Sequence, residues 1–235
     1  MTAAGANAAI AARDLAVLWH PCTQMKDHEW LPMVPIRRGE GVWLEDFEGK
    51  RYLDAISSWW VNLFGHANPR INAALRDQLD RLEHVILAGF THEPALELAE
   101  RLVSVTPAGL DRVFYADNGS AAVEVALKMS YHFWRNSGRS ERTKFVTLAN
   151  SYHGETLGAL AVTDVPLFRT TYEPLLARHA TVPSPDARLA RDGETPRDVA
   201  ERAARALEDH LAGHHATTAA LIVEPLVQGA TGMAM

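Results

Sequence analysis

Cysteine is almost absent from this chain, and so are the signs of export. Cys22 is the single cysteine among 235 residues, so no disulfide can form within the chain, and a reducing compartment such as the cytoplasm is the simplest expectation. The alanine-rich N-terminus lacks a basic start and a long apolar core, which argues against a signal peptide or a membrane span. Residues 1–12 are therefore interpreted as a disordered tail.

An excess of positive charge is also missing. The chain has 23 Lys and Arg against 29 Asp and Glu, a formal net charge of −6, whereas nucleic-acid binding requires a clustered basic surface. The sequence contains no G-x-G-x-x-G motif, no Walker loop and no G-x-S-x-G motif. Its 47% hydrophobic and 22% charged residues are typical of a globular protein, and neither nucleic acid nor a membrane is expected as a partner.

After Asp111, short apolar runs alternate with helical stretches, which predicts an α/β fold with a parallel sheet. Strands are expected at 113–115, 144–148 and 219–223, and helices at 121–134, from 155, and from 196 towards 210. The earlier part of the chain predicts a hairpin of 42–44 with 52–53 and two helices, which start at Asn68-Pro69 and near Pro94.

Polar residues follow each of the three expected strands, where open α/β sheets bind ligands. Gly119 and Ser120 could cradle a phosphate at a helix start, or belong to an ordinary capped helix. Tyr152 and His153 could offer a stacking ring and an imidazole, or be a surface tyrosine and a packed histidine. Glu224 is either a site residue or half of a structural ion pair.

Two other clusters contain residue types that occur in binding sites. His210 and His214 have the spacing of a zinc pair and His215 adjoins them, but Gly213 indicates a helix end and no nearby Cys or acidic ligand completes a set, so no metal site is predicted. Trp59 and Trp60 are adjacent and must point in different directions. At least one of them is expected to meet an interface, a cofactor or a ligand.

Several motifs resemble those of the class III, fold-type I aminotransferases that depend on pyridoxal 5'-phosphate, over about residues 18–233. They are Trp19-His20-Pro21, Leu53-Asp54-Ala55-Ile56-Ser57-Ser58-Trp59-Trp60, Phe64-Gly65-His66, Gly89-Phe90-Thr91-His92-Glu93-Pro94, Asp117-Asn118-Gly119-Ser120, Tyr152-His153-Gly154-Glu155-Thr156 and Val223-Glu224-Pro225-Leu226-Val227-Gln228-Gly229. The resemblance implies that residues 13–57 belong to the small domain and 58–235 to the first part of the large parallel-sheet domain.

The Trp-His-Pro and Ser-Ser-Trp-Trp elements resemble the biotin-biosynthesis branch of the family. This resemblance implies transfer of an amino group from S-adenosylmethionine to 8-amino-7-oxononanoate, giving 7,8-diaminononanoate, by a cytoplasmic homodimer. It also implies that Gly119 and Ser120 hold the cofactor phosphate and that Tyr152 stacks on the cofactor ring and borders the substrate. Trp59 and Trp60 would line the substrate pocket, whereas the role of Glu224 near the cofactor stays open.

The sequence departs from the family pattern at two points. Cys22 stands where many members have a substrate-contacting tyrosine, so the donor could be lysine or another amine. The family's Schiff-base lysine lies beyond the Glu-Pro strand, and none of the lysines present matches its motif: Lys26, Lys50, Lys128 and Lys144. The chain is therefore expected to be a truncated or partial copy that is inactive alone, with a non-catalytic phosphate-ligand or partner-binding module as the alternative.

Overall fold

The computed structural model describes residues 5–31 and 33–234. The contacts within the chain divide it into two units, Met1–Arg101 and Leu102–Met235. This division does not coincide with the boundary expected after residue 57, which rests on the resemblance to complete family members and stays a prediction.

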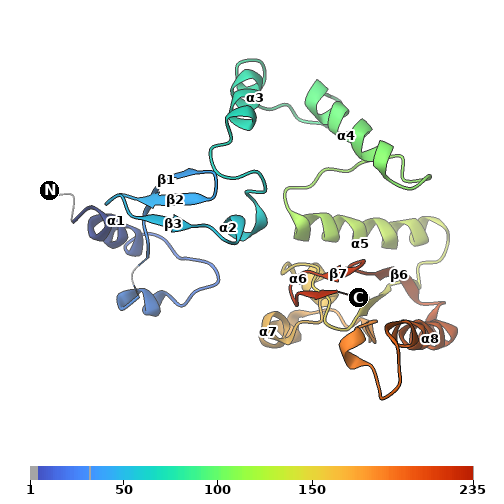
Figure 1. Cartoon of the computed structure of the whole chain (residues 1–235). Helices are drawn as coiled ribbons and strands as arrows, with labels where there is room; N and C mark the ends of the chain where they lie inside the picture. The colour runs from blue at the N-terminus through green and yellow to red at the C-terminus, as the bar shows by residue number, and fades with distance from the viewer. Residues whose placement is uncertain (1–4, 32, 235) are drawn as a thin grey trace. The chain divides into compact units, whose positions relative to one another are not determined.

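A helix, α1 (Ala6–Leu15), begins the first unit (Figure 1). Its alanines favour helix, and Asn7 anchors it: the Asn7 Nδ2 donates to Asp46 Oδ2 at 2.9 Å, and the backbone N–H of Phe47 donates to Asn7 Oδ1 at 3.1 Å. The expected disordered tail is therefore wrong for residues 6–12, because the anchor lies about 40 positions away in the sequence; residues 1–4 lie outside the described residues.

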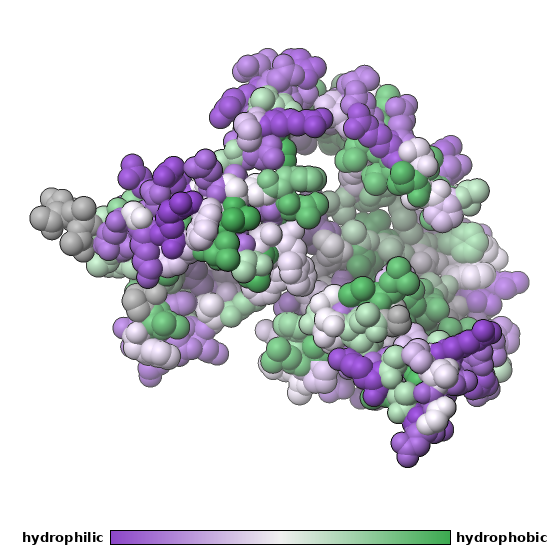
Figure 2. Space-filling model, in the orientation of Figure 1, coloured by the Kyte–Doolittle hydropathy of each residue, from purple (hydrophilic) through white to green (hydrophobic). Residues whose placement is uncertain are grey.

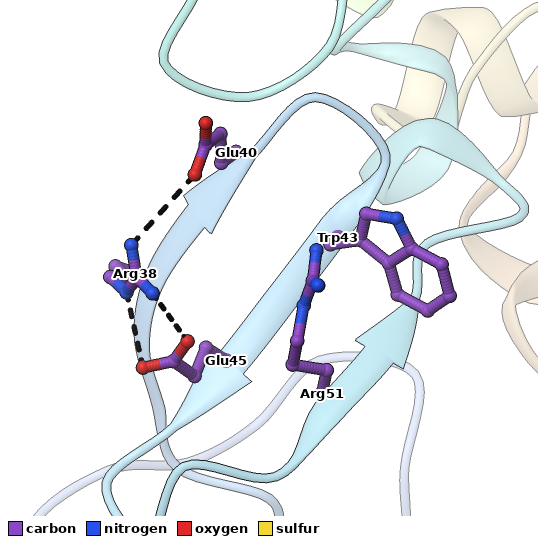
Figure 3. Close-up of a pocket in the computed structure, with 5 residues that line it drawn as sticks. All are labelled: Arg38, Glu40, Trp43, Glu45 and Arg51. Carbon is purple, nitrogen blue, oxygen red and sulfur yellow. Dashed lines mark hydrogen bonds and ion pairs between the residues drawn. The ribbon is translucent and has the colours of Figure 1, made fainter.

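A three-stranded antiparallel sheet follows, with β1 (Ile36–Glu40), β2 (Trp43–Asp46) and β3 (Arg51–Leu53) in that order. The pairing of β2 with β3 confirms the predicted hairpin. Figure 3 shows a shallow pocket on this sheet, in which Arg38 lies between Glu40 and Glu45 and the Arg51 guanidinium stacks on the Trp43 ring, 4.7 Å from its centroid. These contacts join neighbouring strands, because Arg38 of β1 pairs with Glu45 of β2 and Arg51 of β3 lies over Trp43 of β2.

Among the described residues, four further helices belong to this region, two of which the sequence pattern predicts. A short 3-10 helix, η2 (Met25–Glu29), precedes the sheet, and α2 (Ser57–Trp60) follows it. Helix α3 (Pro69–Leu79) begins after Asn68, whose side chain accepts the first free backbone N–H groups, and α4 (Glu93–Val105) ends before Pro107. Both predicted helix starts are confirmed.

The second unit is a three-layer α/β structure. Its parallel sheet has the order β5-β4-β6, formed by Ala180–Val182, Lys144–Leu148 and Thr218–Ile222. Helix α5 (Gly119–Asn136) packs on one face, where its Leu127 meets Phe145 of β4. Helix α8 (Pro196–His214) packs on the other face, where its Leu207 meets Val146 and Leu148. The alternating side chains of β4 thus join both layers, and the expected parallel α/β fold is confirmed.

Shorter elements complete this unit. They are α6 (Leu157–Ala161), α7 (Pro166–Arg169), η3 (Thr170–Leu175), η4 (Ala187–Leu189), β7 (Val227–Gln228) and β8 (Met233–Ala234). Helix α8 begins with a capping box, in which the side chains of Thr195 and Asp198 each accept the other's backbone N–H.

One predicted strand is wrong. Residues 113–115 form no strand, and the Phe114 side chain is 64% exposed. No described segment pairs with these residues, and without a neighbour an apolar run gains no ladder hydrogen bonds. Large hydrophobic side chains are also exposed elsewhere, and Figure 2 shows them in green at the surface.

Candidate functional site

Three segments that lie far apart in the sequence meet beyond the carboxyl end of the parallel sheet. They are the start of α5, the loop after β4 and the segment after β6. The backbone N–H of Glu155 donates to Ser120 Oγ at 3.1 Å, and the backbone N–H of Tyr152 donates to Glu224 Oε2 at 2.8 Å. The structure therefore brings together Ser120, Tyr152 and Glu224, as parallel strand ends do in open α/β sheets.

The start of α5 is open to an anion. Asn118 caps the helix by accepting the backbone N–H of Ala121 at 2.9 Å, whereas the N–H groups of Gly119 and Ser120 have no acceptor among the described residues. A Cβ placed on Gly119 would have no atom within 4 Å. Unpaired N–H groups at the positive end of an 18-residue helix favour a phosphate or carboxylate.

Gly154 allows the loop after β4 to close on this helix start. Its φ is +126°, and a Cβ at this position would lie 2.1 Å from Ser120 Oγ and 3.0 Å from Ser120 Cα. Only glycine combines this backbone conformation with this approach. The loop can therefore lie this close to the helix start only because residue 154 has no side chain.

The orientation of Tyr152 is fixed at three points. Its backbone is bound to Glu224, its hydroxyl donates to Glu155 Oε1 at 2.9 Å, and its ring meets the edge of Phe168 with 5.3 Å between centroids. The residue is partly exposed. A tyrosine ring held in this way could present a face to a planar ligand beside the start of α5.

Glu224 is satisfied by backbone groups. Besides the bond from Tyr152, its Oε1 accepts the backbone N–H of Gly229 at 2.9 Å. In the described part of the chain, no Lys, Arg or His forms an ion pair with this carboxylate, and its hydrogen-bond partners there are backbone groups. Glu224 instead ties the tyrosine loop to the turn after β6.

His153 is partly buried and is held by two threonines. Its Nε2 lies 3.3 Å from Thr147 Oγ1, and its backbone N–H donates to Thr163 Oγ1 at 2.9 Å. Burial lowers the pKa of the His153 imidazole, and the nearby Glu224 charge opposes this only in part. Of the two interpretations from the sequence, His153 is the packed histidine.

Glu124 contributes a contact to which the sequence reasoning gave no role. From the second turn of α5, its Oε1 accepts the backbone N–H groups of Gly158 and Ala159, at 2.8 and 3.3 Å. Glu124 therefore caps α6, whose own N-cap residue Thr156 makes no side-chain cap. Nothing in the local sequence indicates this contact, since Thr156 is itself a favourable N-cap residue and Glu124 lies 34 residues from Gly158.

The predicted substrate residues lie in the first unit. Trp59 and Trp60 belong to α2, in which all four residues have positive φ, between +47° and +69°. Their side chains are 62% and 69% exposed, and Cys22 is an exposed free thiol with φ +58°. Both tryptophans are thus available to a ligand or another polypeptide surface.

The histidine cluster of α8 makes local contacts. The rings of His210 and His214 stack at 4.5 Å, and the Nδ1 atoms of His214 and His215 bond to carbonyl groups one turn earlier. Within residues 5–31 and 33–234 no group of three or more potential ligands could hold a metal ion. In the same residues no helix has the length and apolar character needed to cross a membrane.

Comparison with known proteins identifies relatives of this arrangement. The family model "Aminotransferase class-III" matches residues 24–235. Adenosylmethionine-8-amino-7-oxononanoate aminotransferases from Helicobacter pylori and Geobacter sulfurreducens are 49% and 45% identical, over 95% and 92% of this chain and 49% and 48% of their own lengths. The chain thus spans about half the length of the curated relatives it matches.

Solved structures agree with this family. The adenosylmethionine-8-amino-7-oxononanoate aminotransferase from Methanocaldococcus jannaschii is 35% identical with a TM-score of 0.83, over 94% of this chain and 48% of that one. The omega transaminase from Pseudomonas jessenii, in complex with PMP, is 30% identical with a TM-score of 0.88, over 96% of this chain and 50% of that one.

Proposed function

Because the chain belongs to the class-III aminotransferase family, we propose that it forms the cofactor-binding part of an aminotransferase that depends on pyridoxal phosphate. The observation that supports this most directly is the open start of α5, where Gly119 and Ser120 present free N–H groups under the loop that holds Tyr152. The residues present fit a phosphate and a flat ring beside it.

Each residue of this site has a separate task. The backbone N–H groups of Gly119 and Ser120 bind the phosphate oxygens. The Ser120 hydroxyl accepts from Glu155, so its own proton is left to donate to the phosphate. Tyr152 orients the cofactor ring by stacking, and Glu224 keeps Tyr152 in place through its backbone. When bound, pyridoxal phosphate supplies the electron sink that amino transfer requires.

The proposed reaction is transfer of an amino group from S-adenosylmethionine to 8-amino-7-oxononanoate, which gives 7,8-diaminononanoate. The names of the relatives at 40–49% identity support this choice. Trp59 and Trp60 line the substrate pocket and exclude water from it. The complete protein is proposed to be a cytoplasmic homodimer, as the resemblance to the family implies.

Cys22 supports a second candidate, in which lysine or another amine is the donor. A thiol is a weaker hydrogen-bond donor than a tyrosine hydroxyl, so recognition of the donor would change at this position. The complete protein should be assayed with 8-amino-7-oxononanoate and each donor in turn, with mass spectrometry of the product. Formation of 7,8-diaminononanoate from lysine but not from S-adenosylmethionine would favour the second candidate.

A binding experiment tests the phosphate site without requiring turnover. In Gly119→Ala the new Cβ would meet no protein atom, and we expect it to hinder the approach of a phosphate to the N–H groups at this helix start. We expect affinity for pyridoxal phosphate, measured by absorbance titration, to fall about tenfold or more, with an unchanged unfolding midpoint. Gly213→Ala is the matched control, since Gly213 also has no atom within 4 Å of a Cβ. Unchanged affinity in Gly119→Ala would place the phosphate elsewhere.

A further inference from the structure

The turn that carries the two tryptophans is held in an unfavourable conformation. Ser57, Ser58, Trp59 and Trp60 form one turn of left-handed helix, with φ values of +50°, +47°, +64° and +69°. None of these residues is glycine, and for such residues a left-handed conformation is unfavourable at every position. A turn of this kind persists only where surrounding contacts impose it.

Asp54 supplies those contacts. Its Oδ1 accepts the backbone N–H of Ser58 at 2.9 Å, and its Oδ2 accepts the Ser58 hydroxyl at 2.7 Å and lies 2.8 Å from Nε2 of His66. The Asp54 side chain is only 6% exposed. The bonds from the Ser58 backbone, the Ser58 hydroxyl and His66 together lower the pKa of Asp54 to about 2. The carboxylate therefore stays ionised and keeps all three partners at neutral pH.

His66 is in turn fixed to the antiparallel sheet. Its backbone N–H donates to Gly41 O at 2.7 Å, and Gly41 N–H donates to His66 O at 3.0 Å. A Cβ on Gly39 would lie 2.7 Å from the His66 side chain, so the ring lies directly on β1. Nδ1 of His66 lies 3.3 Å from Asn62 Nδ2, which leaves the Nε2 proton for Asp54. A continuous chain of contacts thus runs from the sheet through His66 and Asp54 to Ser58.

We propose that Asp54 and His66 are positioning residues that hold Trp59 and Trp60 in the left-handed turn and thereby set the affinity of the enzyme for its amino acceptor. This inference rests on the proposed function, in which the two tryptophans line the substrate pocket. Neither residue of the pair has to touch the substrate. Their effect is exerted through Ser58, which directly precedes the first tryptophan.

The variants Asp54→Asn and Ser58→Ala weaken this connection at two different points. In the complete enzyme we expect KM for 8-amino-7-oxononanoate to rise about tenfold or more, with a smaller change in kcat, because ground-state and transition-state binding are lost together. Glu45→Gln is the matched control: it breaks the pair with Arg38 on the same sheet without touching the turn. When Ser58→Gly is added to Asp54→Asn, residue 58 adopts its positive φ without steric cost. The double variant should therefore regain part of the affinity for 8-amino-7-oxononanoate that Asp54→Asn loses.

Fluorine NMR of protein labelled with 5-fluorotryptophan reports on the turn without substrate. We expect the signals of Trp59 and Trp60 to shift or broaden in Asp54→Asn and Ser58→Ala and to stay in place in Glu45→Gln. Unmoved signals would overturn the proposal. The proposal would also be overturned if the signals move in Asp54→Asn and Ser58→Ala but both variants keep a normal KM, while Trp59→Ala raises KM. If Trp59→Ala and Trp60→Ala both leave KM normal, the proposed substrate pocket is the part that fails.

Discussion

Gly154→Ala is the substitution with the clearest consequence for this site. Two costs combine at this position, because the residue has φ +126° and because its missing side chain leaves room for Ser120. An added Cβ would lie 2.1 Å from Ser120 Oγ, 2.9 Å from its Cβ and 3.0 Å from its Cα. Rotation of the serine side chain relieves only the first of these contacts, so the loop or the helix start must move.

The two costs can be separated by a control. A non-glycine residue at this φ costs about 1–3 kcal/mol, and overpacking of a tight contact costs about 1–3 kcal/mol more. The expected loss of stability is therefore roughly 2–6 kcal/mol. Gly138 has φ +73° and no atom within 4 Å of a Cβ, so Gly138→Ala should cost only the backbone part, about 1–2 kcal/mol.

Guanidinium unfolding of both variants, followed by circular dichroism, measures this difference, and a titration with pyridoxal phosphate measures its effect on the site. Gly154→Ala should bind the cofactor more weakly, whereas Gly138→Ala should bind it normally. Adding Ser120→Ala to Gly154→Ala removes the nearest atom and should recover part of the lost stability. Equal destabilisation by Gly154→Ala and Gly138→Ala would refute the close approach of the loop to α5.

Three other predictions concern single contacts. Glu224→Gln replaces one carboxylate acceptor by an amide and should destabilise the protein by about 1–3 kcal/mol in guanidinium unfolding. Glu208→Gln, at an exposed position of α8, should have no effect, and equal results for the two variants would contradict the proposed role of Glu224 in holding Tyr152. Thr195→Ala removes the N-cap of α8 and should cost about 1 kcal/mol in the same assay, and Thr195→Ser should preserve it. The folded-state pKa of Asp54, about 2, lies below its usual 3.8, so its stabilising effect is present above pH 3.8 and is lost as the pH falls towards 2. The stability difference between wild type and Asp54→Asn should therefore shrink over this range, and a constant difference would contradict the assignment.

Much of the site could be predicted because its parts are local. The helix start with Gly119 and the polar loop after β4 each depend on residues within a few positions, and both lie where the sequence pattern indicated, although the helix begins at Gly119 with Asn118 as its cap and not at residue 121 with Ser120 as its cap. Other contacts could not be predicted. Glu124 caps a helix 34 residues away, and Asp54 reaches His66 across 12 residues. Neither pair follows a period or a spacing that a helix or strand imposes.

The sequence alone predicted the parallel α/β fold and the approximate positions of its main helices, because apolar periodicity and helix caps act over one or two turns of chain. It also determined the family, through short motifs at the strand ends. Tertiary structure alone decided that residues 6–15 are helical, that 113–115 form no strand and that His153 contacts Thr147 and Thr163. Tertiary structure also decided that Glu224 binds backbone groups. Each of these outcomes depends on a hydrogen-bond partner that is distant in the sequence, and local sequence patterns do not predict which residue that partner is.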